Sequence, residues 1–308
     1  MLSFYTELNA LNHPSTEHLN FRYAPCSTMR MTSYDGYATA AEFDAGYDNF
    51  ITQEVVAYWE GIFRAESERA LAAHPERREL RYGTGERNGI DFFPAAGVEA
   101  APVLVAIHGG LWFLFDKWVM HFLAGAFTRA GVHVACVNYG LAPGQNLGQI
   151  VGNCRDAVAF LHANAAGLGI DPARVSVLGH SAAGQLAALT ASDTSLEVHA
   201  CVGVSGFYDI VPFAQTHFHE FTRFPVEEYT TWNPLRNVSP GNPPALLITG
   251  AKESSLLQQM MGHYAAALRA NGVGVETIAA PGECHFSVLH AIGREDSELF
   301  RRVRDFVR

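Results

Sequence analysis

The sequence predicts an α/β fold, in which a mostly parallel eight-stranded sheet carries helices on both faces and a small cap lies over one edge. From about residue 78 onward, short β-rich runs alternate with longer segments of helical period. This alternation is typical of βαβ units. Several of the short runs are continuously apolar, as strands must be when helices cover both faces of a sheet.

Eight β-rich runs are the expected strands. They lie at 79–82, 89–93, 103–107, 132–138, 175–178, 200–204, 245–249 and 275–278. Segments whose apolar residues recur at helical spacing are the expected helices. They lie at 47–74, 153–166, 256–270 and 298–307. In the first of them, Val55, Val56, Trp59 and Phe63 share one face.

Residues 46–308 are expected to form one α/β domain. Within it, residues 209–236 break the rhythm of strands and helices, because they are aromatic-rich and strand-poor between two buried strands. We expect this segment to be the cap. Residues 1–45 show no strong period and form an N-terminal extension. Three roles stay open for it: a dimer arm, which would make the protein a homodimer, a cover over the functional site, and a disordered segment.

Composition excludes several classes of protein. The chain has 308 residues, of which 48% are hydrophobic and 17% charged, so disorder is excluded. Its net charge of −10 makes a nucleic-acid partner unexpected. The N-terminus lacks a signal-peptide pattern, and no stretch reaches the roughly 18 apolar residues of a membrane helix. Five cysteines without a CxxC pair are typical of reduced thiols. The sequence therefore predicts a soluble, cytoplasmic protein.

The strongest local signal is RVSVLGHSAAGQLAALTA at residues 174–191, where an apolar strand enters a turn of small residues and then an alanine-rich helix. This is the context of a nucleophile elbow, which lifts a serine hydroxyl clear of the sheet. Ser181 is the candidate nucleophile. The usual fifth-position glycine of the GxSxG motif is replaced by Ala183, and a glycine follows at Gly184.

A second signal lies about 70 residues upstream, where the strand at 103–107 runs into His108-Gly109-Gly110-Leu111-Trp112. Glycines after a strand allow backbone amides to face outward as hydrogen-bond donors. Together with the amide of Ala182, the amides of Gly109 and Gly110 are expected to form an oxyanion hole, which stabilises the charge that develops on an attacked carbonyl.

The expected general base is His285, because it follows the last strand, where a histidine can reach Ser181. His108, His180, His217, His219 and His290 are its competitors. The expected acid is Glu253, the carboxylate that follows the strand at 245–249, and Asp209 is the alternative. An acid at this place holds the imidazole in the correct tautomer.

Other chemistries are not supported. Cys284 follows the wrong strand for a thiol nucleophile and lacks an elbow. His217 and His219 lack a third metal ligand at a recognisable spacing. No GxxxxGK[ST] motif is present, and the glycines at 83–89 miss the dinucleotide spacing. We therefore expect neither a metal nor another cofactor.

The chain resembles the α/β-hydrolases, and within them the hormone-sensitive-lipase-like branch. It is most similar to the kynurenine formamidase (arylformamidase) group and its bacterial esterase relatives. The residues that carry the resemblance are HGGLW at 108, DKW at 116, NYGLAP at 138, the run 155–184, SGFYD at 205 and HFSVL at 285. It covers about residue 46 to the end. The resemblance also implies a triad of Ser181, Glu253 and His285. Members of the group often have an aromatic residue at the place of Leu111, glycine at Ala183 and aspartate at Glu253.

Aromatic residues are dense after the oxyanion glycines and in the expected cap, which favours a planar or apolar substrate. Leu111, Trp112, Phe207 and Tyr208 are the expected substrate-binding residues. The sequence thus predicts a serine hydrolase that cleaves a small aryl or apolar ester or amide through an acyl-enzyme and is similar to kynurenine formamidase. A general carboxylesterase, a specialised amide or carbamate hydrolase, and a non-catalytic ligand-binding homologue stay open as alternatives.

Overall fold

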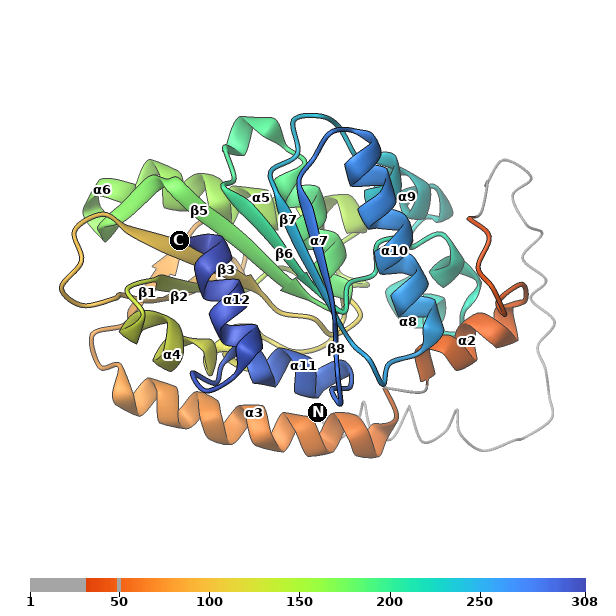
Figure 1. Ribbon diagram of the computed structural model, residues 1–308, viewed down its shortest axis with the longest axis horizontal. Helices are drawn as coiled ribbons and strands as arrows, with labels where there is room; N and C mark the ends of the chain where they lie inside the picture. The colour runs from red at the N-terminus through yellow and green to blue at the C-terminus, as the bar shows by residue number, and fades with distance from the viewer. Residues whose placement is uncertain (1–31, 49–50) are drawn as a thin grey trace.

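The computed structural model describes residues 32–48 and 51–308, which are built around one eight-stranded sheet (Figure 1). The strand order is β1-β2-β4-β3-β5-β6-β7-β8. The pairs β1–β2 and β2–β4 are antiparallel, and the other five pairs are parallel. The predicted fold class is therefore confirmed, and each expected strand is present.

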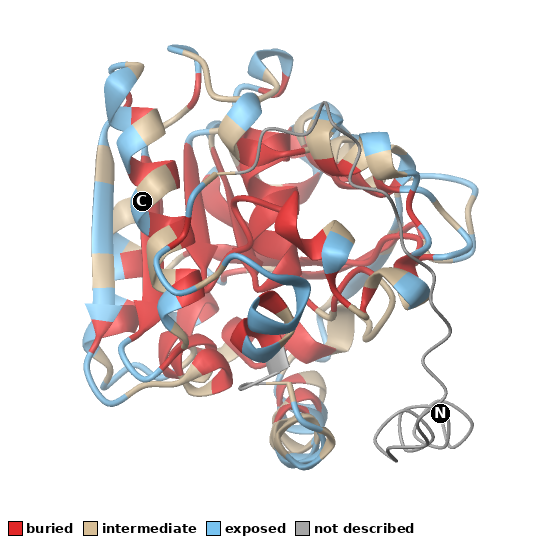
Figure 2. Ribbon diagram, turned by 90° about the vertical axis from the view of Figure 1, so that its right-hand side faces the viewer, coloured by how far each residue is buried: buried red, intermediate tan, exposed pale blue. Residues whose placement is uncertain are grey.

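The strands match the expected runs within a few residues. They are β1 (Arg78–Arg81), β2 (Gly89–Phe93), β3 (Ala101–Ile107), β4 (His133–Val137), β5 (Ile170–His180), β6 (Ala200–Val204), β7 (Ala245–Gly250) and β8 (Val275–Ala280). Every residue of β2, β3, β4, β6 and β7 is buried, whereas the edge strands β1 and β8 are largely exposed or half-buried. The continuous apolar runs are thus the strands inside the sheet, and Figure 2 shows the buried interior of the sheet in red.

Helices cover both faces of the sheet (Figure 1). One face carries α3 (Gln53–Ala73), α4 (Leu123–Arg129), α11 (His285–Ile292) and α12 (Glu298–Val307). The other face carries α5 (Leu147–Ala163), α6 (Ala165–Leu168), α7 (Ala182–Ala191) and α10 (Ser255–Ala270). Short 3-10 helices lie in the connections between strands and helices. They are η1 (Lys117–Met120), η2 (Thr194–Leu196), η3 (Pro212–Gln215) and η4 (Pro234–Arg236). None of the helices in the described ranges is long and apolar enough to span a membrane.

Two helix boundaries differ from the expected ones because of capping. The expected helix at 47–74 is two helices, α2 (Ala40–Asp48) and α3, and α3 starts where the Thr52 side chain accepts a hydrogen bond from the Val55 amide. Helix α5 starts earlier than expected, because Asn146 and Gln149 form a reciprocal capping box. The apolar period alone does not show these polar caps.

The segment 209–236 contains η3, α8 (His219–Thr222), α9 (Val226–Thr231) and η4, and it packs beside α2. Tyr47 of α2 meets the rings of Phe207 and Phe213 edge-on, and the Tyr34 hydroxyl donates to Asp209 at 2.9 Å. The expected boundary at residue 45 therefore falls inside α2. Residues 1–31 lie outside the described ranges, and the roles considered for the extension stay predictions.

The turn between β5 and α7 is closely packed at backbone level. A Cβ atom on Gly179 would overlap the Ala183 carbonyl, and one on Gly184 would overlap the Cα of Gly206, which follows β6. The glycine that follows Ala183 is therefore required by the neighbouring loop. This contact fixes the start of α7 against the end of β6.

We expect Gly184→Ala to destabilise the protein by about 1–3 kcal/mol, because the added methyl group overpacks this contact. Gly152→Ala is the matched control, since a Cβ at that position within α5 meets no atom within 4 Å. The control should gain about 0.5–1 kcal/mol, as alanine is the better helix former. Urea unfolding of both variants measures the difference, and equal stabilities would contradict the proposed packing role.

Candidate active site

Ser181 stands at the turn between β5 and α7 in a strained backbone conformation, with φ 58° and ψ −127°. Positive φ is uncommon for a residue with a side chain and concentrates at functional sites. Ser181 is buried, with 5% of its surface exposed, and it lines a cavity. The turn thus presents the hydroxyl at the carboxyl end of the sheet, as the elbow pattern predicts.

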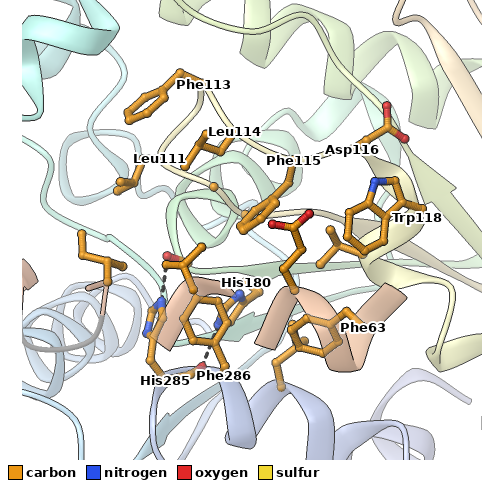
Figure 3. A pocket seen from close by; sticks show the side chains of 18 of the residues that line it. Phe63, Leu111, Phe113, Leu114, Phe115, Asp116, Trp118, His180, His285 and Phe286 are labelled. Carbon is orange, nitrogen blue, oxygen red and sulfur yellow. Dashed lines mark hydrogen bonds between the residues drawn. The ribbon is translucent and has the colours of Figure 1, made fainter. Parts of the chain in front are cut away.

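Ser181, His285 and Glu253 lie in one hydrogen-bonded series, and Figure 3 shows His285 at the edge of the cavity. The Ser181 Oγ is 2.9 Å from the His285 Nε2, and the His285 Nδ1 is 3.0 Å from the Glu253 Oε2. His285 follows the last strand, as expected, and it is the first residue of α11. The structure therefore brings together the three side chains that the sequence singled out.

The carboxylate of Glu253 is held in place by two further donors. Its Oε1 accepts a hydrogen bond of 2.5 Å from the Ser205 hydroxyl and one of 2.6 Å from the Gly250 amide. The side chain is fully shielded from solvent. These contacts leave Oε2 directed at His285. A buried carboxylate with several donors stays oriented, which is the property that a supporting acid needs.

Asp209, the alternative acid, lies elsewhere and makes different contacts. It accepts hydrogen bonds from the Tyr34 hydroxyl, the Asn233 side-chain amide and the Val211 backbone amide. Its partners thus belong to the segment 209–236 and to the residues that precede α2. Asp209 therefore joins these two segments. The carboxylate that contacts His285 is that of Glu253.

The other candidate histidines have partners of their own. The His180 Nε2 lies 2.8 Å from the His285 backbone oxygen, and burial keeps the pKa of His180 well below its usual value. Burial also lowers the pKa of His108 to about 4. The remaining three pair with Asp44, Tyr229 and Glu66: these are His217, His219 and His290. Among the six histidines, the hydrogen bond to Ser181 is made by His285.

The expected oxyanion donors lie around Ser181. A Cβ atom on Gly109 would come within 2.7 Å of the His180 carbonyl oxygen and 3.2 Å of the Ser181 Cβ, so this glycine lies directly against the turn that carries Ser181. Gly110 has φ 105° and lines the same cavity. Ala182 is the first residue of α7, and the first amides of a helix have no acceptor within it.

A cavity of about 570 Å³ opens beside Ser181 and His285. Its walls are mainly aromatic and aliphatic, and Figure 3 shows the rings that surround it. The aromatic lining consists of Phe63, Phe113, Phe115, Trp118, Phe218, Phe221 and Phe286. Charged side chains are few: Glu60, Arg87 and Asp116. The volume and the lining fit a small, largely apolar molecule.

Of the four expected substrate-binding residues, only Leu111 lies in this wall. Trp112, Phe207 and Tyr208 are at most 1% exposed and belong to the core. The Trp112 ring meets Phe207 and Phe213 edge-on, and its Nε1 donates to Gln185. The expectation that these three line the site is therefore corrected. The rings of Trp112 and Phe207 pack against Phe213 of the segment 209–236, whereas the Tyr208 ring stacks on Tyr264 of α10.

Helix α3 also contributes to the wall, which the sequence pattern did not indicate. Gln53, Val56, Glu60 and Phe63 from this helix line the cavity. Val56 and Phe63 belong to the apolar face that was identified from the helical period, but that period does not tell which neighbour the face meets. Since α3 lies more than 100 residues before Ser181, only the tertiary structure brings the two together.

A second series of hydroxyl, imidazole and carboxylate groups lies away from the cavity. The Ser67 Oγ is 2.9 Å from the His121 Nδ1, and the His121 Nε2 is 2.8 Å from the Asp91 Oδ2. All three residues are at most 4% exposed, and none of them lines the cavity. Because a substrate cannot reach Ser67, this series ties α3 to β2 and has a structural role.

No cluster of three or more His, Cys, Asp or Glu residues suited to a metal ion occurs in residues 32–48 and 51–308. Cys136, Cys154, Cys201 and Cys284 are free thiols, and Cys26 lies outside these ranges. Burial raises the pKa of Cys154 well above its usual value and that of Cys201 to about 12. These two thiols are therefore protonated at neutral pH.

Curated proteins similar to this chain include hydrolases. Kynurenine formamidase of Salmo salar is 26% identical over 269 residues, which are 82% of this chain and 87% of that protein. A probable isoprenylcysteine alpha-carbonyl methylesterase of Arabidopsis thaliana is 25% identical over 241 residues, which are 68% of this chain and 50% of that protein. This chain thus matches nearly the whole formamidase but spans only half the length of the methylesterase.

Solved structures have the same fold. A Silicibacter protein superposes with a TM-score of 0.74 at 24% identity, covering 84% of this chain and 98% of its own. A bacterial heroin esterase superposes with a TM-score of 0.60 at 27% identity, covering 75% of this chain and 81% of its own. The BD-FAE family model matches residues 91–261, more than half of the chain. The chain therefore belongs to the BD-FAE family and has the α/β-hydrolase fold.

Proposed function

We propose that this protein is a serine hydrolase that cleaves a small aryl or apolar ester or amide through an acyl-enzyme, in the manner of a kynurenine formamidase. The observation that carries the proposal is the hydrogen-bonded series of Ser181, His285 and Glu253 at the edge of an aromatic cavity. The similarity to a formamidase and to esterases supports ester or amide hydrolysis.

In the first step, the Ser181 Oγ attacks the substrate carbonyl carbon while the His285 Nε2 accepts the hydroxyl proton. The 2.9 Å separation of these atoms allows direct transfer. Glu253, at 3.0 Å from the opposite ring nitrogen, stabilises the imidazolium that forms. His285 then returns the proton to the leaving alcohol or amine, and an ester to Ser181 remains.

The amides of Gly109, Gly110 and Ala182 donate to the oxyanion as the carbonyl becomes tetrahedral. Such preorganised donors stabilise the transition state more than the ground state, because the charge on the oxygen develops only during the reaction. In the second half of the reaction, His285 activates a water molecule that attacks the acyl-enzyme. The acid product leaves, and Ser181 recovers its proton.

The cavity supports the substrate class. Seven aromatic side chains line it, and aromatic walls favour planar or apolar groups. An aryl formamide, an aryl ester and an apolar carbamate all fit this description. The similarity to a kynurenine formamidase over most of both chains supports an aryl formamide as the first substrate to test. A non-catalytic ligand-binding role would not require the ordered contacts between Ser181, His285 and Glu253.

The first test is Ser181→Ala, which should lower kcat by about four orders of magnitude or more, since no nucleophile remains. A fluorophosphonate should label the wild-type protein and fail to label this variant. Ser192→Ala is the matched control, because Ser192 lies at the far end of α7, where its hydroxyl donates to the Leu189 carbonyl oxygen. Turnover by Ser181→Ala at the wild-type rate would exclude the mechanism.

The second test separates the two carboxylates. Glu253→Gln should lower kcat by about 10²- to 10⁴-fold, because an amide does not stabilise the imidazolium. Asp209→Asn should lower the thermal midpoint and change kcat by less than about threefold, since Asp209 accepts three hydrogen bonds away from His285. Steady-state kinetics and thermal melts of both variants distinguish them. A larger loss of kcat in Asp209→Asn would assign the acid to Asp209.

The third test compares kcat/KM for N-formylkynurenine and for a short-chain aryl acetate, with Ser181→Ala as the blank. We expect the formamide to be preferred, because the aromatic walls accept its aryl group. A preference for the acetate would make the protein a carboxylesterase. Slow turnover of both substrates, together with fluorophosphonate labelling of Ser181, would point to a different ester, amide or carbamate.

A further inference from the structure

The geometry points to Arg87 as the residue that positions the oxyanion loop, residues 108–116, and we propose this role. The inference rests on the proposed function, since it concerns the oxyanion donors of that mechanism. Arg87 lies in the connection between β1 and β2, far along the chain from the expected triad. No motif in the sequence marks it, and its role follows from its contacts.

One guanidinium group joins two loops. The Arg87 Nη2 donates to the Phe115 carbonyl oxygen at 2.7 Å and to the Asn138 Oδ1 at 2.8 Å, and Nε donates to the Tyr139 carbonyl oxygen at 2.8 Å. Its Nη1 lies 3.3 Å from the Asp116 Oδ2. Phe115 and Asp116 end the oxyanion loop, whereas Asn138 and Tyr139 follow β4. The planar fork of arginine suits this arrangement, and a lysine ammonium cannot reproduce it.

The oxyanion loop needs such a restraint because its backbone is strained. Leu111, Trp112 and Phe115 have φ of 51°, 63° and 71°, which is the left-handed region that residues with side chains rarely adopt. Strained backbone persists only where the surroundings over-determine it. Arg87 binds the carbonyl of Phe115, one of the three strained residues. The guanidinium therefore holds the loop in a conformation that the chain would otherwise leave.

The restrained end of the loop lies against an oxyanion glycine. A Cβ atom on Gly110 would come within 2.5 Å of the Leu114 carbonyl oxygen and within 2.8 Å of the Phe115 ring. A shift of Phe115 would therefore move Gly110 and its amide. At the other end, the Tyr139 hydroxyl donates to the His108 carbonyl oxygen at 2.7 Å. Since Arg87 also binds the Tyr139 carbonyl, it supports both ends of the loop.

Polar side chains behind the loop add further hydrogen bonds to this restraint. The Asn138 side chain donates to the Asp116 Oδ2 at 2.6 Å and accepts from Arg87 through its Oδ1. The His108 Nε2 lies 3.1 Å from the same Oδ1. The DKW and NYGLAP sequences, which the triad itself does not use, thus contribute Asp116 and Asn138 to this network. Arg87 is a positioning residue: it acts on the reaction through the Gly109 and Gly110 amides.

The test uses two ketones of the same apolar skeleton, a trifluoromethyl ketone and the matching methyl ketone. Ser181 Oγ adds to the carbonyl carbon of the first, its proton passes to His285, and the carbonyl π electrons become the oxyanion that the loop amides bind. The methyl ketone binds largely without this addition. The ratio of their Ki values therefore reports oxyanion stabilisation, independently of how the cavity binds the skeleton.

We expect Arg87→Met to lower kcat by about tenfold to a hundredfold and to raise the Ki of the trifluoromethyl ketone by about the same factor, while the Ki of the methyl ketone stays within twofold. Arg87→Lys should recover only part of the loss. Arg81→Met is the matched control: Arg81 donates to the Gly85 and Glu86 carbonyl oxygens of the same connection, and its loss should leave both Ki values unchanged.

If Arg87 only stabilised the fold, its variants would melt at a lower temperature with an unchanged ratio of Ki values, and the proposal would be overturned. An equal rise in both Ki values would also overturn it, because that result means a collapsed cavity. Arg87→Lys, which keeps the charge, decides the question if Arg87→Met does not fold. Failure of the proposed function itself is distinguishable, since Ser181→Ala would then retain turnover and the wild-type protein would bind both ketones equally.

Discussion

Strand β5 pairs with β3 on one side and with β6 on the other, and the rest of the site depends on this arrangement. Because these strands are parallel, their carboxyl ends meet at one edge of the sheet. The oxyanion loop follows β3, Ser181 follows β5, and Ser205, which supports Glu253, follows β6. β7 and β8 continue the parallel order and bring Glu253 and His285 to the same edge. Backbone hydrogen bonds thus set the distances that the proposed chemistry needs.

The site combines strained backbone with dense restraint. Ser181 has a positive φ, and so do several residues of the oxyanion loop. Close contacts hold both segments in this conformation. Gly184 packs on Gly206 beneath the turn that carries Ser181, and the hydrogen bonds of Arg87 hold the loop. Strain at a functional site is compatible with a stable fold when neighbouring packing over-determines the conformation. The unstrained parts of the sheet supply that rigidity.

Burial strengthens the hydrogen bonds and electrostatic interactions of the polar groups in the site. Ser181, His285 and Glu253 are each less than 9% exposed, and the cavity beside them is mainly apolar. Hydrogen bonds and charges act more strongly where water is excluded. The same burial lowers the pKa values of His108 and His180, which lie next to the site, because it disfavours the charged imidazolium. The Glu253 carboxylate lies at the Nδ1 of His285.

The sequence by itself determined the strands, the longest helices, the turn that carries Ser181 and the order of Ser181, Glu253 and His285 along the chain, because these depend on local periodicity and on residue types that a tight turn requires. Only the tertiary structure decided which residues line the cavity. Trp112, Phe207 and Tyr208 carry the same aromatic signal as Phe113 and Phe115, but packing turns the first three into the core. Likewise, nothing local to α3 or to Arg87 shows that they meet residues far along the chain. Long-range contacts of this kind depend on how the layers pack, and a one-dimensional pattern does not contain that information.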